Sequence, residues 1–411
     1  MPPSSKSEPL DAGGLFSPYH LLTLYFPAFV FALGYSIATP VIPVFAKSFD
    51  TGFGVASLVI VVHGFGGLVA AVPTGFLLDR LGRRPVLFGG PLLMAASSLL
   101  TAVARSFPEL LIYRFLGGAA MEMWRQARLA VIADVGKSRQ RGRQVTGLVG
   151  IDGAGRMLGP AVGGVLAAWS LRMPFVVHGA LALLAILPSF FLVRESAPAN
   201  DEDSKNKHHR FDTRELLALM LDHRYRGFFG AQFFASMTRA IMWGGTLLLY
   251  ATYAYEASPQ LLGGLATTTS VVGIPITLCC GYLMDRFGRK TTMVPGFVLI
   301  ALGLMFLASS AQWQWSVITF VAGYLWIHGG QSVTSGSMQV LGADMAPAAA
   351  RGRFFGFWRL IGEIGGLVSP ALFALVAAQL TYSAAFALFA FCSLAAAALL
   401  AFCVQETVAR R

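Results

Sequence analysis

The sequence predicts an all-α integral membrane protein whose twelve transmembrane helices form two pseudo-symmetric six-helix bundles. The first observation is composition: 55% of the 411 residues are hydrophobic and only 12% are charged, with a mean hydropathy of +0.64. Soluble domains carry about 25% charged residues, so this composition indicates a bilayer as the solvent. The other two observations are the apolar segments along the chain and an internal repeat.

Twelve segments reach the roughly 20 apolar residues that a spanning helix needs. They cover residues 19–46, 53–78, 85–105, 108–135, 144–169, 173–194, 224–254, 259–284, 291–310, 314–343, 353–378 and 382–404. We therefore expect a tail at 1–18, a bundle at 19–194, a second bundle at 224–404 and a tail at 405–411. The polar stretch 195–223 joins the bundles, and Asp212 is expected to cap a short amphipathic helix there, at the membrane surface.

A ten-residue stretch occurs twice, as GFLLDRLGRR at 75–84 and GYLMDRFGRK at 281–290, an offset of 206 positions (281 − 75). A second match joins DVGKSRQRGR at 134–143 with DMAPAAARGR at 344–353, an offset of 210 (344 − 134). Charged turns repeated between apolar spans indicate two homologous bundles. Two halves that rock about a shared midplane are typical of secondary transporters.

Basic residues gather on one side of the predicted spans. On that side lie Arg80, Arg83, Arg84, Lys137, Arg139, Arg141, Arg143, Lys205, Lys207, Arg210, Arg214, Arg286, Arg289, Lys290, Arg351, Arg353, Arg410 and Arg411. On the other side, Lys47, Arg105 and Arg172 are the main exceptions. Because Lys and Arg accumulate in cytoplasmic loops, this asymmetry predicts that both termini and the linker are cytoplasmic. It also accounts for the net charge of +11 without a nucleic-acid partner.

Three motifs carry a family resemblance. The first comprises Gly75, Asp79, Arg80, Gly82 and Arg83, with a weaker copy at Gly281, Asp285, Arg286, Gly288 and Arg289; the second comprises Arg114, Gly117 and Gly118; the third comprises Gly155, Gly159, Pro160, Gly163 and Gly164. With them the chain resembles the major facilitator superfamily over nearly its whole length. The third motif is similar to the fifth-helix motif of proton-coupled antiporters, chiefly drug exporters.

The resemblance implies a secondary active transporter that works by alternating access. It also implies a multi-pass protein of a bacterial-type cell membrane, a monomer that uses the proton gradient and needs no cofactor. In the family, contacts of the first motif latch the cytoplasmic side in the outward-open state. For Arg83 the best candidate partner is Asp134, and Arg289 with Asp344 is the counterpart in the other half. The alternative is that these arginines serve only as topology signals.

Glycines in the third motif recur every four residues, at Gly155, Gly159 and Gly163. This spacing forms a smooth strip that lets a partner helix pack closely. Pro160 removes a backbone donor and can bend the helix. Gly75 and Gly82 in the first motif are expected to permit close approach and a tight turn.

Ionisable residues inside the spans are the most distinctive chemistry, since each costs at least about 2.5–3.5 kcal/mol at mid-bilayer. Three acid–base pairs stand at helical spacing: Glu122–Arg125, Asp152–Arg156 and Arg359–Glu363. Each pair can serve packing or transport. Arg239 is a further cation in span seven. In span four, Arg114, Gly118, Met121, Arg125 and Arg128 form a stripe along one face of the helix, and its three arginines are charged. His63, His178 and His328 are either hydrogen-bonded core residues or contacts for protons or substrate.

Proton-coupled antiport is the mechanism that these residues favour, with Glu122 as first candidate for the proton carrier and Asp152 and Glu363 after it. Arginines outnumber acids in the spans, which favours an anionic, zwitterionic or acid-headed amphiphilic substrate. Proton-coupled uptake or exchange of an organic anion or phosphate-bearing metabolite is the alternative, and a non-transporting receptor is a third. We predict no enzyme and no metal site, because the sequence contains no HExxH, P-loop or GxSxG motif and no cysteines at metal-ligand spacing.

Overall fold

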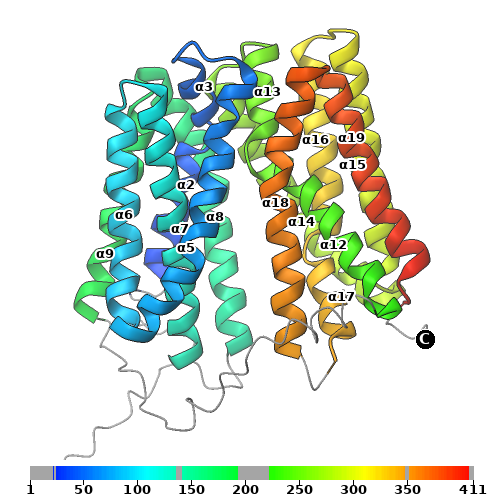
Figure 1. Ribbon diagram of the computed structural model, residues 1–411, viewed down its shortest axis with the longest axis horizontal. Helices are drawn as coiled ribbons and strands as arrows, with labels where there is room; N and C mark the ends of the chain where they lie inside the picture. Colours follow the sequence, from blue (N-terminus) through cyan, green and yellow to red (C-terminus); the bar gives the residue numbers. More distant parts are fainter. Residues whose placement is uncertain (1–21, 23–24, 136–140, 193–221, 348–350, 407–411) are drawn as a thin grey trace, which may run out of the picture.

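The computed structural model describes residues 22, 25–135, 141–192, 222–347 and 351–406. The predicted tail at 1–18, nearly all of the linker with its amphipathic helix, and most of the tail at 405–411 lie outside these residues. The described residues form helices and no strand. Figure 1 shows two bundles side by side, the first half of the chain in blue to green and the second in green to red.

The first bundle contains α2 (Phe26–Ala38), α3 (Ile42–Lys47), α4 (Phe53–Ala56), α5 (Leu58–Leu81), α6 (Arg83–Val103), α7 (Phe107–Val135), α8 (Arg141–Trp169) and α9 (Met173–Leu192). The second contains α12 (His223–Trp243), α13 (Thr246–Ala254), α14 (Pro259–Phe287), α15 (Lys290–Gln312), α16 (Val317–Thr334), α17 (Ser337–Met345), α18 (Arg351–Gln379), α19 (Tyr382–Ala398) and the π-helical turn η3 (Leu399–Cys403). Each of the twelve predicted segments coincides with one of these helices or with a consecutive pair.

Seven helical stretches of the described residues are long and apolar enough to cross a membrane by length and composition. The helices of spans four, five and seven are not among these seven stretches, because the charged residues inside them lower their apolar content. The all-α fold of two helical bundles is confirmed.

Four predicted spans are interrupted, which hydropathy did not reveal. Span one breaks between α2 and α3 at Pro40, which lacks an N–H donor. Span seven breaks between α12 and α13 at Gly245, whose φ of +88° suits glycine, and span ten breaks at Gly336 in the same way with φ of +76°. A shorter break separates α4 from α5 at Ser57. Thr39 and Gly245 are 206 positions apart (245 − 39), so the first and seventh spans break in register with the sequence repeat.

The two ends of the bundles differ, and we name them by their residues. The motif end carries Gly82 and Gly288, and the far end carries residues 47–53 and 250–259. At the far end the bundles are in contact: α3 meets α13 (Figure 1), and Phe53 packs edge-on against Tyr382 at 5.0 Å between ring centroids. Lower down, the Ala161 amide donates to Thr267 Oγ1 at 3.0 Å. This conformer is therefore closed at the far end.

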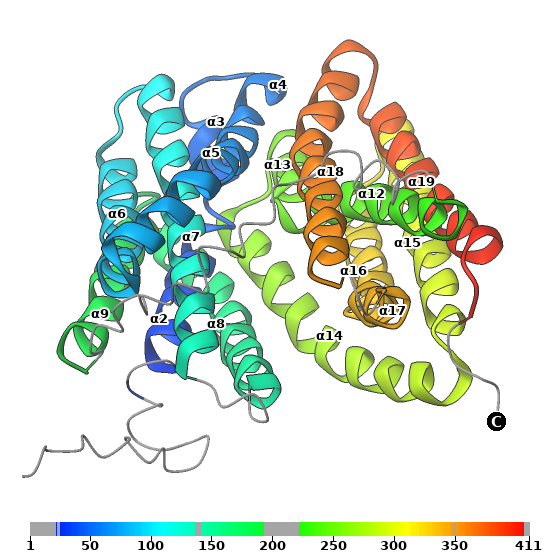
Figure 2. The same cartoon turned by 60° about the horizontal axis from the view of Figure 1, so that its bottom comes forward.

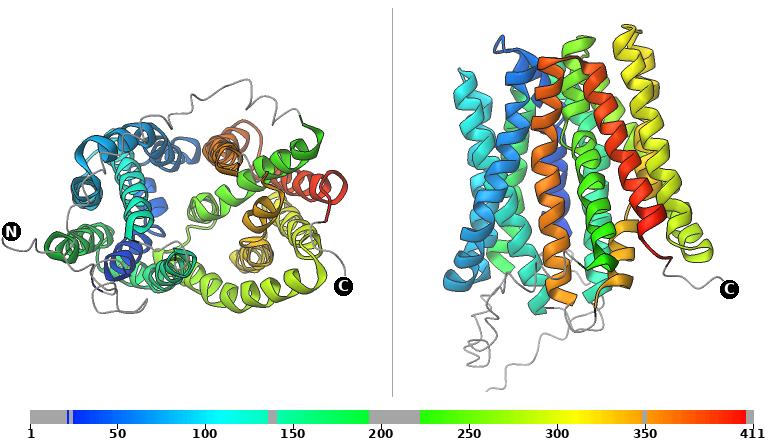
Figure 3. Two further views of the ribbon diagram at one scale, coloured as in Figure 1. Left: turned by 90° about the horizontal axis from the view of Figure 1, so that it is seen from below. Right: turned by 45° about the vertical axis from the view of Figure 1, so that its right-hand side comes forward.

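Helix α8 lies between α2 and α14, as Figures 2 and 3 also show. Its strip of Gly155, Gly159 and Gly163 packs on the α2 backbone, as predicted. A Cβ on Gly163 would lie 2.0 Å from the Ile37 carbonyl oxygen, so only glycine permits this approach. Gly164 continues the contact on the other side, against Pro259 of α14. The third motif therefore packs α8 within its own bundle and against the opposite one.

Gly163→Ala is expected to lower the free energy of unfolding by roughly 1–3 kcal/mol, because α2 must move away from α8. Gly153→Ala on the same helix is the matched control. Open space surrounds Gly153, so the control should be neutral or gain up to about 1 kcal/mol of helix propensity. Thermal and denaturant unfolding of the purified protein in detergent measures both. Equal stability of the two variants would contradict the packing role of the strip.

Candidate functional site

Glu122 lies at the centre of a polar cluster between the bundles. Its carboxylate is about 10% exposed and accepts hydrogen bonds from Arg125, one of them 2.9 Å from Nε, and from Gln126 Nε2 at 2.6 Å. Gln126 also donates to the Ala71 carbonyl at 3.0 Å, which ties α7 to α5. Across the bundle interface, the guanidinium of Arg359 on α18 lies 3.9 Å from the same carboxylate. Both bundles therefore contribute a cation to one buried acid.

The C-terminal side of this cluster is more exposed. Arg359 lies 3.6 Å from Glu363, so the predicted pair one helical turn apart on α18 is confirmed. The Glu363 side chain is 57% exposed, and Arg239 on α12 lies within its electrostatic reach. Among the described residues, Arg239 makes one long hydrogen bond, 3.4 Å to Ser236 Oγ. Because these charges have few tight partners, a ligand can rearrange them at little cost.

Asp152 does not pair with Arg156, which corrects the prediction. Instead it forms a two-pronged salt bridge with Arg128 of α7, at 2.9 and 2.8 Å, with both side chains about 15% exposed or less. Helical spacing identifies neighbours on one helix, but the better partner came from the adjacent helix and offered bidentate geometry. Arg156 is exposed, one turn from Pro160, which contacts α14. Asp152 therefore joins α7 to α8 inside the first bundle.

The predicted stripe along span four is not one ligand surface. Gly118 is covered by α5, since a Cβ there would lie 1.8 Å from the His63 carbonyl oxygen. Arg128 is neutralised by Asp152 and lies over the Trp124 ring at 5.8 Å. The stripe thus separates into Arg125 at the central cluster and Arg114 nearer the far end.

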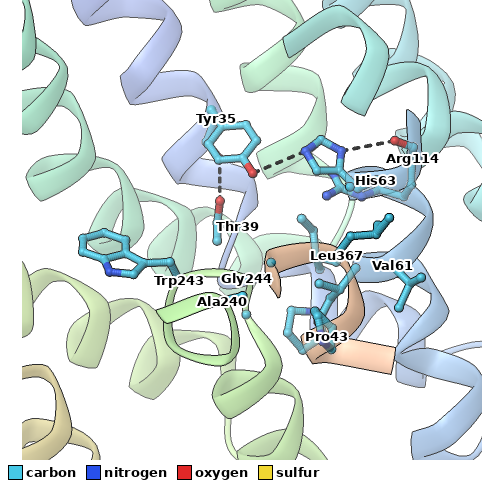
Figure 4. A pocket seen from close by; sticks show the side chains of 16 residues that line it. Tyr35, Thr39, Pro43, Val61, His63, Arg114, Ala240, Trp243, Gly244 and Leu367 are labelled. Atoms are coloured by element: carbon cyan, nitrogen blue, oxygen red, sulfur yellow. Dashed lines mark hydrogen bonds between the residues drawn. The ribbon is translucent and has the colours of Figure 1, made fainter. Parts of the chain in front are cut away.

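A cavity of about 180 Å³ lies where the two helix breaks meet (Figure 4). Thr39 and Pro43 line it from the first bundle, and Trp243 and Gly244 line it from the second. We call it the break pocket. Drug-sized ligands occupy about 300–1,000 Å³, so the break pocket suits one group of a substrate and not a whole molecule.

One wall of the break pocket is polar. His63 Nδ1 lies 3.2 Å from the Arg114 carbonyl oxygen, and because a carbonyl only accepts, Nδ1 donates. His63 Nε2 then accepts a weak hydrogen bond of 3.5 Å from the Tyr35 hydroxyl (Figure 4). Arg114 Nε is buried and has no hydrogen-bond partner among the described residues. A cation with unused donor capacity therefore lies at this wall.

The other two histidines are buried in the bundles. Ser98 donates to the Phe175 carbonyl at 3.0 Å, so at the 2.9 Å contact His178 Nδ1 is the donor to Ser98 Oγ. His328 packs against Tyr324 with 4.3 Å between ring centroids. In the described part of the chain, Nε2 of each of these two histidines has no hydrogen-bond partner. His178 lies beside Tyr35 and His328 beside Trp243, at 6.2 and 6.3 Å between ring centroids, and both partners line the break pocket.

At the motif end, the predicted contact between Arg289 and Asp344 is present. Arg289 donates to Asp344 at 3.2 Å and to Asp285 at 2.6 Å. Burial lowers the pKa of Arg289, but the hydrogen bonds and the negative charges of Asp285 and Asp344 together outweigh it and raise the pKa above its ordinary value. Glu406, which belongs to no sequence motif, accepts from the Arg289 and Lys290 amides at 2.8 and 3.0 Å and caps α15.

The matching contact in the first bundle, Arg83 with Asp134, involves an Asp134 side chain outside the described residues. Asp79 and Arg80 are exposed, as is Arg286 in the second copy. Gly82 turns the chain with φ of +86°, as predicted. Open space surrounds Gly75 and Gly281, so the close approach expected at Gly75 is absent in this conformer.

Several contacts of these sites were not anticipated from the sequence. Gln126, Tyr35 and Trp243 have side chains that serve equally as ordinary span residues, so pattern alone did not single them out. Pro40 and Gly245 were the sequence features that could have located the break pocket. Helix-breaking residues at corresponding places in two repeats point to binding sites in transporters.

Two repeated helical bundles, breaks in register and a buried acid shared by cations from both bundles define a membrane transporter of the two-bundle class. The Major Facilitator Superfamily model matches residues 24–231 and 228–411, and the chain belongs to this family. It is therefore a multi-pass membrane transporter and not an enzyme.

Among curated relatives, the chain is 25% identical over 310 residues to quinolone resistance protein NorA of Staphylococcus aureus (strain MRSA252), covering 72% of this chain and 75% of that one. It is 24% identical over 269 residues to multidrug resistance protein 2 of Bacillus subtilis (strain 168), covering 64% and 66%. Solved structures share the fold. A D-xylose-proton symporter matches with a TM-score of 0.73 at 17% identity, covering 95% and 98%. A peptide transporter in complex with sulfate matches with 0.73 at 16% identity, covering 95% of each chain.

Proposed function

We propose that this transporter is a proton-coupled antiporter that exports a small amphiphilic molecule with an acidic group. The observation that carries the proposal is Glu122, a buried carboxylate whose cationic neighbours Arg125 and Arg359 come from opposite bundles. An acid in this position can respond both to protons and to the relative placement of the bundles.

Coupling follows from competition for the same charges. When Glu122 is ionised, it neutralises Arg125 and attracts Arg359. When it takes a proton, both guanidinium groups become available to a carboxylate or phosphate on the substrate. Conversely, an anion bound to these arginines favours protonation of Glu122. Such cooperative binding by itself would carry proton and anion in the same direction, as in the second candidate below. For outward export the substrate must also compete with the proton for Glu122, as the cationic end of a zwitterion or a hydrogen-bond donor does, so that binding of protons from outside releases it.

The acidic group of the substrate has a second place to bind, in the break pocket beside Arg114. A small pocket with one cation and the Trp243 ring on the opposite wall accepts a charged group attached to a flat apolar body. Trp243 is 56% exposed and meets the His328 ring edge-on at 6.3 Å between centroids, which leaves ring surface for stacking. The names of the two curated relatives, which refer to quinolone and multidrug resistance, support export of drug-like compounds.

In this proposal the motif end faces the cytoplasm, because the basic residues of the connecting loops lie there. The proton gradient supplies the energy without a cofactor. A single chain holds both bundles and the whole cluster, so a monomer suffices. Proton-coupled uptake or exchange of an organic anion is the second candidate, and the excess of arginines over acids favours it as much as it favours an acidic export substrate.

A tolerance assay in bacteria separates export from uptake. Cells that express the protein are grown with matched pairs of amphiphilic compounds, one with a carboxylate and one with its amide. Export predicts raised tolerance to the carboxylate compounds, lost when a protonophore collapses the gradient. Thermal stabilisation of the purified protein by the same compounds at two pH values reports binding directly. Unchanged or lowered tolerance despite such binding would contradict export and favour uptake.

A further inference from the structure

Lys47 is one of the few basic residues at the far end, and it binds the opposite bundle. Its ammonium group donates to the Thr252 carbonyl oxygen at 3.1 Å, lies 3.8 Å from Glu256 and sits 5.5 Å from the centre of the Tyr253 ring. Thr252 belongs to the last turn of α13, where carbonyl groups have no partner within the helix. A cation at a helix C-terminus also interacts favourably with the helix dipole.

Tyr253 makes the reciprocal contact. Its hydroxyl donates to the Thr51 carbonyl oxygen at 2.7 Å, and its ring packs edge-on against Phe53 at 5.8 Å. The Thr51 side chain is itself satisfied by the Ala46 carbonyl at 3.2 Å and adds only a 3.4 Å contact to the Tyr253 hydroxyl. The main polar bond between Tyr253 and the first bundle therefore uses a backbone acceptor.

These bonds join residues 47–51 of one bundle to 252–256 of the other. They exist only while the far ends are together, and they are lost when the bundles rock apart at this end. An interaction present in one of two conformers shifts the balance between them by its differential free energy. The pairing gives Lys47 partners on a side of the membrane that is otherwise poor in basic residues.

We propose that Lys47 and Tyr253 form a polar lock that holds the far end closed and sets the fraction of molecules open on that side. The lock is a gate and not part of the proton or substrate site, since it lies beyond the break pocket. It rests on the proposed function only for alternating access and for the assignment of the far end to the outside.

The lock is tested by labelling a cysteine in the break pocket. Val61→Cys places the reporter in the pocket wall, in a chain whose cysteines at 279, 280, 392 and 403 are replaced by serine. A membrane-impermeant maleimide is added to intact cells and, separately, to inside-out vesicles. Tyr253→Phe removes one hydrogen bond and is expected to raise labelling from the far side by roughly 2- to 12-fold, as loss of a single net hydrogen bond allows. Lys47→Met should act in the same direction.

Thr51→Ala is the matched control, because it leaves the backbone acceptor of Tyr253 in place and should label at the parent rate. Parent-rate labelling of both Tyr253→Phe and Lys47→Met, on either side of the membrane, overturns the lock. If Tyr253→Phe fails to fold, Lys47→Met alone decides. The assay uses neither substrate nor a proton gradient. Faster labelling of the variants without any proton-coupled transport would support the lock and overturn the proposed function. Parent-rate labelling together with proton-coupled transport would overturn the lock and support the proposed function.

Discussion

Glu122→Gln is expected to lower transport driven by a pH gradient by roughly 5- to 150-fold, the range of typical coupling free energies between two sites. The amide keeps the shape of the side chain but can neither take nor release a proton. It also leaves Arg125 without its carboxylate, so binding of an acidic compound at fixed pH should persist or strengthen. Transport into proteoliposomes with an imposed pH gradient measures the first effect, and ligand-induced thermal stabilisation measures the second.

Glu363→Gln is the control for this prediction. Glu363 also lies within reach of Arg359, at 3.6 Å, but it is 57% exposed and has no tight hydrogen bonds among the described residues. Its loss should therefore reduce pH-driven transport by less than about fivefold, which is below the range expected for a coupled site. A Glu122→Gln variant that keeps full pH-driven transport, or a Glu363→Gln variant that alone abolishes it, would move the proton carrier away from Glu122.

Asp152→Ala is expected to have the largest effect on stability, about 3–5 kcal/mol, because it leaves the Arg128 guanidinium buried without its counter-ion. The double variant Arg128→Met with Asp152→Leu should recover most of this loss, since an apolar pair of similar volume removes both charges. Chemical and thermal unfolding in detergent gives the free energies.

Arg156→Ala is the informative control for Asp152. Arg156 stands one turn from Asp152 on α8 and is exposed, so its removal should cost less than about 1 kcal/mol. If Arg156→Ala costs as much as Asp152→Ala, then Asp152 depends on the neighbour on its own helix and the salt bridge to Arg128 does not dominate.

The fold could be predicted from the sequence because its signals are local or repeated. Apolar runs located the helices, and the copy of GFLLDRLGRR at 281–290 showed that the second half repeats the first. The contact of Arg289 with Asp344 was also predictable. The first repeat places Arg289 after span eight, and the second places Asp344 at the end of span ten, on the same side of the membrane.

The partners inside the bundles could not be predicted in the same way. Helical phase shows which residues share a face but not which helix covers that face. Helical spacing therefore paired Asp152 with Arg156 on its own helix, whereas the packing of α7 against α8 brings Arg128 to it. The contact of Glu122 with Arg359 joins residues 237 positions apart (359 − 122) and depends on how the two bundles dock. The break pocket follows from interruptions that leave mean hydropathy unchanged.

The most direct test of the account measures protons and substrate together. Proteoliposomes that contain the protein, a pH-sensitive dye and a carboxylate compound identified by thermal stabilisation are given an outward substrate gradient without a pH gradient. Proton-coupled antiport through Glu122 predicts that substrate efflux drives protons inward, and that Glu122→Gln lowers this proton flux by the same roughly 5- to 150-fold. Protons that leave together with the substrate, or substrate efflux with no proton movement in the parent protein, would contradict it.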